Sequence, residues 1–129
     1  YFFFFFFENI KSERALVMDA RSAGRFIGTE PEPRAGLPSG HIPKSVNLPF
    51  TEVLYEGKFK PREKLKEIFK SLNPENNPVI FTCGSGVTAC ILYLANELAG
   101  KIEKSVFDGS WTEWVHHKDH PIHREAEKR

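Results

Sequence analysis

Short apolar runs, each closed by a polar or turn-forming residue, divide the chain into predicted strands. Residues 15–18 are apolar and end at Asp19, which is typical of a buried strand. Residues 79–82 form a second such run and residues 105–107 a third. The short segment 46–48 predicts a further strand inside a longer irregular region.

Two longer segments have helical spacing instead. After Pro61, apolar residues recur every three or four positions until Asn73-Pro74 ends the pattern. Residues 87–99 predict an apolar helix ended by Gly100. Strands that alternate with helices in this way predict an α/β fold with a central, mostly parallel sheet flanked by helices.

The remaining regions are set apart by composition. Tyr1 is followed by six phenylalanines, and segment 1–9 is interpreted either as a buried strand or as wrongly assigned sequence. Five of the nine prolines fall within residues 31–49, so a long irregular loop is expected there. One domain is expected over residues 10–117, followed by a polar, solvated tail over residues 118–129.

Composition and charge exclude several classes of protein. The chain has 129 residues, about one domain, and 18 Lys and Arg against 17 Asp and Glu. This balance argues against nucleic acid as a partner, because nucleic-acid binders usually carry a basic excess. No apolar run approaches the ~18 residues of a membrane span, so no membrane partner is expected. The two cysteines are too few for a disulfide framework.

Cys83 stands where three effects stabilise an anion. It follows the predicted strand 79–82, at the end where open α/β sheets bind ligands. Gly84 and Gly86 permit a tight curl with inward-pointing backbone N–H groups, and the next helix adds its N-terminal partial charge. We therefore predict that Cys83 is a nucleophilic thiolate. A buried structural cysteine is the alternative interpretation.

Other cysteine chemistries fit the sequence less well. Thiol phosphatases and arsenate reductases need an Arg that clamps the oxyanion, and Ala89 stands at that position, with Thr82 before the cysteine. Cys90 lies seven residues after Cys83, two turns along the predicted helix. Cys90 is therefore predicted to pack in the core rather than to resolve an oxidised Cys83.

The segment Cys83–Thr88 resembles the active-site loop of the rhodanese superfamily, in the form found in 3-mercaptopyruvate sulfurtransferases. Further motifs follow in the order that this family shows, and the resemblance spans roughly residues 10–117. It corresponds to the carboxyl-terminal, catalytic half of a two-domain enzyme. The further motifs are Asp19-Ala20-Arg21, Gly24-Arg25-Phe26, Gly28–Arg34, Ser39–Pro43 and Asp108–Trp114.

The resemblance implies a rhodanese-like fold and a persulfide mechanism. Cys83 would attack the sulfur of 3-mercaptopyruvate, or less well of thiosulfate, and pass that sulfur to a thiol or to cyanide. Ser85 would belong to a proton-handling group completed by a His and an Asp of an amino-terminal rhodanese domain, which is expected to be missing from this chain. The loop residues that would cradle the outer sulfur are Gly84, Gly86, Val87 and Thr88.

Arg25 and Arg34 have two interpretations. By composition alone, each is a solvated arginine. A guanidinium is also suited to clamping the carboxylate of a donor, and the resemblance assigns that role to both residues. Gly84 and Ser85 are uncharged where thiosulfate-preferring rhodaneses carry a basic pair, so a monocarboxylate donor is expected to be preferred over a dianion.

Other polar and aromatic residues are given structural roles. His41 is predicted to be packed or capping, Asp19 to fix loop hydrogen bonds, and Trp111 and Trp114 to be core. Pro121 interrupts the histidine-rich end of the chain, and no Cys or carboxylate completes a metal-binding set. No metal and no cofactor is expected.

Two functions from different classes remain. The first is the sulfurtransferase, whose partners would be a small-molecule sulfur donor and a thiol acceptor, either a small thiol or a thioredoxin-like protein. The second is a persulfide relay or binding module without mercaptopyruvate activity, which would not need the Arg25 and Arg34 clamp. The presence of both arginines favours the enzyme. The cytoplasm or the mitochondrion is the expected compartment.

Overall fold

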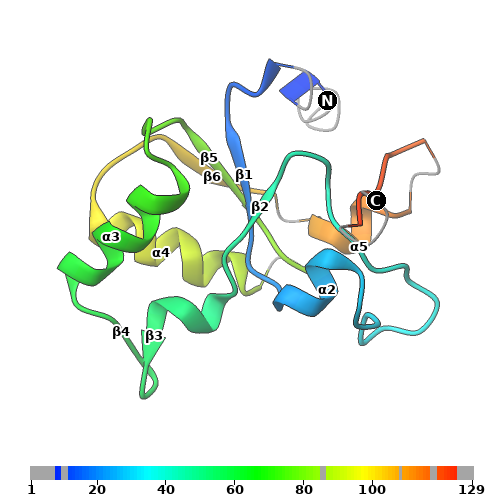
Figure 1. Cartoon of the computed structure of the whole chain (residues 1–129), viewed down its shortest axis with the longest axis horizontal. Coiled ribbons are helices and arrows are strands. Elements are labelled where there is room, and N and C mark those ends of the chain that lie inside the picture. The colour runs from blue at the N-terminus through cyan, green and yellow to red at the C-terminus, as the bar shows by residue number, and fades with distance from the viewer. Residues whose placement is uncertain (1–7, 10–11, 85–86, 108, 117–118, 125–129) are drawn as a thin grey trace.

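A computed structural model of the chain shows a parallel sheet with helices packed around it (Figure 1). The structure describes residues 8–9, 12–84, 87–107, 109–116 and 119–124, so the aromatic run at residues 1–7 lies outside it. The sheet order is β2-β1-β5-β6, with every neighbouring pair parallel. The predicted fold class is confirmed. The strands are β1 (Leu16–Asp19), β2 (Val46–Asn47), β5 (Val79–Thr82) and β6 (Lys104–Val106).

Among the described residues, three α-helices connect strands and a fourth follows the last strand. The longer two, α3 (Arg62–Leu72) and α4 (Ala89–Ala99), coincide with the segments of helical spacing, and α2 (Ala23–Ile27) and α5 (Ser110–Trp114) are short. The sequence did not indicate the 3-10 helix η1 or the antiparallel hairpin β3-β4, because two-residue strands carry too little alternation to recognise. These elements are η1 (Phe50–Val53), β3 (Leu54–Tyr55) and β4 (Lys58–Phe59).

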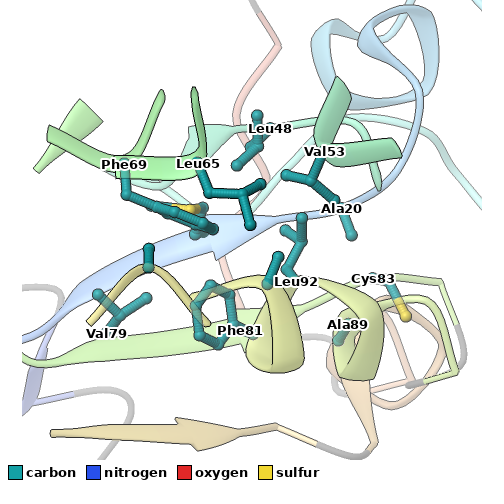
Figure 2. Packing of buried hydrophobic residues seen from close by; sticks show 13 residues of the cluster. Ala20, Leu48, Val53, Leu65, Phe69, Val79, Phe81, Cys83, Ala89 and Leu92 are labelled. Carbon is teal, nitrogen blue, oxygen red and sulfur yellow. The ribbon is translucent and has the colours of Figure 1, made fainter. Parts of the chain in front are cut away.

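The sheet separates two apolar clusters. Alternate residues of a strand point to opposite faces, so Phe81 enters the cluster under α3 and α4, whereas Ile80 enters the cluster beside α5. Figure 2 shows the first cluster, with Leu65 and Phe69 of α3 above the sheet and the Cys83 side chain near Ala89. Both faces of the central strands are covered, which explains why β5 is buried throughout and begins with three apolar residues.

The inward face of α4 corrects one sequence prediction. Ala89, Leu92 and Ala95 recur at helical spacing and are buried, whereas Cys90 is exposed. Cys90 is one residue past Ala89, about 100° further around the helix, and therefore points away from the sheet. The prediction that Cys90 is a core residue was wrong, because the helix is apolar on both faces and its pattern did not identify the buried one.

Residues 119–124, the described part of the tail that the sequence predicted to be solvated, make hydrogen bonds to the rest of the fold. His123 and His41 exchange two backbone hydrogen bonds of 2.8 Å, the Trp114 indole N–H donates to the Pro121 carbonyl, and Arg124 Nε donates to the Ser39 carbonyl. Residues 119–124 therefore pack against the body of the fold, and we call them the C-terminal strap.

The carboxyl ends of β1 and β5 meet at one edge of the sheet, because the two strands are parallel and Asp19 pairs with Thr82. Asp19 leads into Arg21 and α2, and Thr82 leads into Cys83 and α4. The Phe107 N–H donates to the Phe81 carbonyl beyond the end of β6, which brings the start of α5 to the same edge. Three loops therefore converge on Cys83.

Candidate active site

Residues of α5 form hydrogen bonds with the backbone of Cys83. Its N–H donates to Ser110 Oγ at 3.0 Å, and its carbonyl accepts the Trp111 N–H at 2.9 Å. Ser110 Oγ also lies 4.0 Å from Cys83 Sγ and 2.7 Å from the Phe107 carbonyl, to either of which its single proton can be donated. Ser110 is fully buried and has a φ of 52°, a left-handed conformation that costs a non-glycine residue energy.

The next residue of the loop is anchored in the same way. The Gly84 carbonyl accepts hydrogen bonds from the Thr112 N–H at 2.9 Å and from Thr112 Oγ1 at 2.8 Å. The predicted catalytic Ser85 and the predicted binding residue Gly86 lie outside the described residues. The start of the loop is thus held by two consecutive residue pairs, with Cys83 itself only 1% exposed.

Arg25 lies against this loop. Its Nε donates to Glu32 Oε2 at 3.0 Å and its Nη2 donates to Glu32 Oε1 at 2.8 Å, a bidentate ion pair. These hydrogen bonds raise the pKa of Arg25 above its ordinary value, more than partial burial lowers it, and the charges of Glu32, Asp19 and Cys83 add to the rise. Arg25 is therefore a permanent cation beside Cys83.

Glu32 is itself held by a buried arginine that the sequence analysis did not single out. Arg21 donates from Nη1 to Glu32 Oε2 at 3.0 Å, from Nη2 to Asp19 Oδ2 at 2.8 Å and from Nη2 to the Gly40 carbonyl at 2.6 Å. Its guanidinium also lies 4.5 Å from the ring centroid of Trp111. Two carboxylates and two guanidinium groups thus form one chain, in the order Asp19, Arg21, Glu32, Arg25.

A pocket of about 250 Å³ opens between this network and the cysteine loop. The structure brings five of the predicted binding residues together in its lining, and their role in binding stays a prediction. Arg34 is exposed, and no ion pair or hydrogen bond to its guanidinium is found in the part of the chain that the structure describes. The lining residues are Arg25, Glu32, Pro33, Arg34, Leu37, Gly84, Val87, Thr88 and Thr112.

The structural roles predicted for other residues are confirmed. The buried His41 ring stacks on Phe26 at 3.8 Å, and its Nδ1 lies 2.7 Å from the Phe26 carbonyl. Trp111 and Trp114 are 1% and 0% exposed, in the cluster beside α5. Asp19 Oδ1 accepts the Arg21 N–H at 2.9 Å and so fixes the loop after β1.

The described residues contain neither a metal centre nor a membrane span. No three His, Cys, Asp or Glu side chains within them are grouped closely enough to hold an ion. None of the helices described is both long and apolar enough to cross a bilayer.

Comparison with known proteins agrees with this geometry. The sequence profile of the rhodanese-like domain matches residues 6–117. The 3-mercaptopyruvate sulfurtransferase of Mus musculus is 53% identical over 109 residues, which cover 83% of this chain and 37% of the mouse protein. The thiosulfate sulfurtransferase of Bos taurus is 47% identical over 112 residues, covering 84% of this chain and 38% of the bovine protein.

The fold has a solved counterpart in yeast. The Tum1 protein of Saccharomyces cerevisiae superposes with a TM-score of 0.79 at 40% identity, over 92% of this chain and 44% of the yeast chain. The chain thus spans well under half the length of each of these relatives. On its sequence profile and its identity to these sulfurtransferases, the chain belongs to the rhodanese-like domain family.

Proposed function

We propose that the chain is the catalytic part of a sulfurtransferase that takes sulfur from 3-mercaptopyruvate through a persulfide on Cys83. The observation that carries the proposal is the pocket, where Arg25 and Arg34 lie beside Gly84, the residue that follows Cys83. A small donor with a carboxylate would meet a guanidinium on one side and, on the other, the loop that begins at Cys83. Sulfurtransferases that resemble this chain at 53% and 47% identity support the same class of reaction.

The transfer balances without an external oxidant. The Cys83 thiolate attacks the sulfur of mercaptopyruvate, an S–S bond forms, and the C–S bond breaks with its electron pair on the departing carbon. The product leaves as the enolate of pyruvate, which takes up a proton at its terminal carbon. The outer sulfur of the persulfide loses the proton that it carried in mercaptopyruvate. An acceptor thiolate then attacks the outer sulfur and regenerates Cys83.

The surrounding residues would divide the remaining tasks. Arg25 and Arg34 would bind the donor carboxylate, and the loop residues Gly84 and Gly86 to Thr88 would hold the outer sulfur. Ser85 would handle a proton, together with groups from a further rhodanese-like domain, because this chain covers only 37% of the mouse relative. Thiosulfate would be a poorer donor, and a small thiol or a thioredoxin-like protein would be the acceptor.

Intact-mass measurement tests this function directly. After addition of 3-mercaptopyruvate, the protein is expected to gain the mass of one sulfur atom and to lose it again on addition of a thiol. Cys83→Ser should abolish the gain. Cys90→Ser is the matched control and should keep it, because Cys90 is exposed on the outer face of α4.

The same measurement separates the two candidate functions. A relay module would gain no sulfur from mercaptopyruvate but would accept one from a persulfidated protein. If wild-type protein shows only that second gain, the relay hypothesis replaces the enzyme.

A further inference from the structure

The guanidinium of Arg25 has two edges that can each bind a carboxylate through two parallel N–H groups. One edge carries Nε and Nη2, and both of these donate to Glu32, at 3.0 and 2.8 Å. The other edge carries Nη1 and the second hydrogen of Nη2. Among the described residues, none accepts a hydrogen bond from Nη1, and Arg25 lines the pocket. The edge left over is the one that suits a planar carboxylate.

Gly84 sets where that second edge lies. A Cβ placed on Gly84 would come within 2.6 Å of Arg25 Nη2, closer than real contacts allow. The tip of an arginine can usually move aside, but this one is tied to Glu32 by two hydrogen bonds. Arg25 can therefore occupy its present position only because residue 84 has no side chain.

Glu32 is a rigid partner for Arg25. Its side chain is 3% exposed, and its Oε2 also accepts a hydrogen bond from Arg21 at 3.0 Å. Arg21 is in turn bound to Asp19 at the end of β1, with 1% exposure on both sides of the pair. The position of Arg25 is thus determined by the central sheet through Glu32, across an unbroken series of ion pairs.

We propose that Glu32 is a positioning residue for donor recognition, which holds one edge of Arg25 so that the other edge presents two N–H groups to a small planar carboxylate beside Gly84. The inference rests on the proposed function for the identity of the donor. It assigns a task to a glutamate of the pocket lining that acts through Arg25 rather than on the reacting sulfur. It also gives Gly84 a steric role, separate from the absence of charge at that position.

The first test compares Glu32→Gln with Glu30→Gln. Glu30 is an exposed glutamate of the same loop whose carboxylate accepts a hydrogen bond from Ser22. Among the described residues no hydrogen bond or ion pair joins it to the Arg25 guanidinium, so it is a matched control. Glu32→Gln should raise KM for 3-mercaptopyruvate about tenfold and change kcat by less than about twofold, because uniform binding is lost. Kinetics with thiosulfate, which has no carboxylate, should change by less than about twofold. Glu30→Gln should change neither.

The second test observes Arg25 without using activity. The Arg25 Nε–H resonance in the NMR spectrum should be protected from solvent exchange in the wild type and in Glu30→Gln, and should lose protection in Glu32→Gln. Pyruvate, which carries the same carboxylate, should bind about tenfold more weakly to Glu32→Gln than to the wild type.

Gly84→Ala acts on the same guanidinium from the opposite side and keeps the inference testable if Glu32→Gln does not fold. The added methyl group should displace Arg25 and weaken pyruvate binding to a similar extent. Combined with Glu32→Gln, the two changes should be less than additive, since both disturb one position.

Three results would overturn the inference. One is an Arg25 Nε–H that stays protected in Glu32→Gln. Another is tighter pyruvate binding in that variant, which would mean that Glu32 competes with the donor for Arg25. The third is an equal loss with mercaptopyruvate and thiosulfate, the sign of a purely structural role. A wild type that binds pyruvate but does not turn over mercaptopyruvate would refute the proposed function alone, since the NMR and binding results still decide the role of Glu32.

Discussion

Arg25 and Arg34 line the same pocket, but the surrounding residues hold their guanidinium groups in place to different degrees. Arg25 is held by two hydrogen bonds to a buried carboxylate, and its side chain is 23% exposed. Arg34 follows Pro33 in an irregular loop, is exposed, and has no ion pair among the described residues. The side chain of Arg25 is therefore ordered before a ligand binds, whereas that of Arg34 would have to be ordered on binding, although both are expected to bind the same carboxylate.

The difference has an energetic consequence. A side chain that must be ordered on binding loses conformational entropy, which for an arginine amounts to about 1.5–2 kcal/mol. For Arg25 this cost has been met on folding, because two hydrogen bonds to Glu32 already hold its guanidinium. Arg25 is therefore expected to contribute more to binding than Arg34, although both carry the same charge.

Removing Arg21, the buried centre of the ion-pair network behind Arg25, should have the largest effect, and that effect is on the free energy of unfolding. Arg21→Ala would leave the carboxylates of Asp19 and Glu32 buried without their shared partner and should lower the free energy of unfolding by about 3–5 kcal/mol. Arg34→Ala is the control and should change it by less than about 0.5 kcal/mol. Urea denaturation of the two variants measures the contrast. Equal urea midpoints for the two variants would mean that the ion-pair network does not stabilise the fold around Arg25.

Arg25 itself should matter most for catalysis. Loss of a charge-assisted hydrogen bond to a carboxylate costs about 1.5–3 kcal/mol, so Arg25→Ala should reduce kcat/KM for 3-mercaptopyruvate tenfold to a hundredfold, by order of magnitude. Arg25→Lys should not restore it, because an ammonium cannot bind Glu32 and the donor through two planar edges. Full activity of the lysine variant would refute the importance of the held geometry.

Arg34 should give a smaller effect that depends on salt. An exposed ion pair contributes up to about 1 kcal/mol, so Arg34→Ala should reduce kcat/KM by about fivefold at low ionic strength and by less at high ionic strength. Arg34→Lys should retain most of the activity, since a mobile cation suffices. Steady-state kinetics at two salt concentrations test this. A loss of kcat/KM as large as that of Arg25→Ala would contradict the expected difference between the held arginine and the exposed one.

The ion pair between Lys104, whose side chain is 4% exposed, and the exposed Glu97 should have the smallest effect. The two atoms lie 2.7 Å apart, and the hydrogen bond from Lys104 lowers the pKa of Glu97 from its ordinary value of 4.5. A carboxylate whose pKa is lowered on folding stabilises the protein fully when the pH is above the ordinary pKa. That stabilisation is lost as the pH falls through the lowered pKa of the folded state. Glu97→Gln should therefore reduce Tm slightly at neutral pH and not in strong acid, as thermal melts at both pH values would show.

Sequence pattern predicted the parts of the fold that rest on apolar periodicity. The strand at residues 79–82 and the helix after Pro61 were found because their residues are buried at regular spacing. The same reasoning failed for Arg21 and Glu32, because charged residues are usually solvated and a pattern does not show that two of them bury each other. Glu32 lies in the motif Gly28–Arg34, in which only the final arginine was given a role. Its position in that motif was the one sequence feature that indicated its importance.

The site shows the same division. Cys83 was identified from the strand, the turn and the helix that meet there, which are local features. Ser110 lies 27 residues after Cys83 and Thr112 lies 28 residues after Gly84, so no local pattern connects these two anchoring residues to the loop. The packed strap was missed for the same reason, because its partners Ser39 and His41 are distant in sequence.

The C-terminal strap bears on where this domain can be cut. The family profile ends at residue 117, yet the hydrogen bonds that close the fold continue to Arg124. A chain shortened after residue 118 would leave the His41 backbone without its bridge and would uncover Gly40, whose carbonyl accepts a hydrogen bond from Arg21. The family profile and the hydrogen bonds of the fold thus end at different residues. A fragment that ends where the profile ends would lose contacts that support Gly40, and with it the Gly40 carbonyl that holds Arg21.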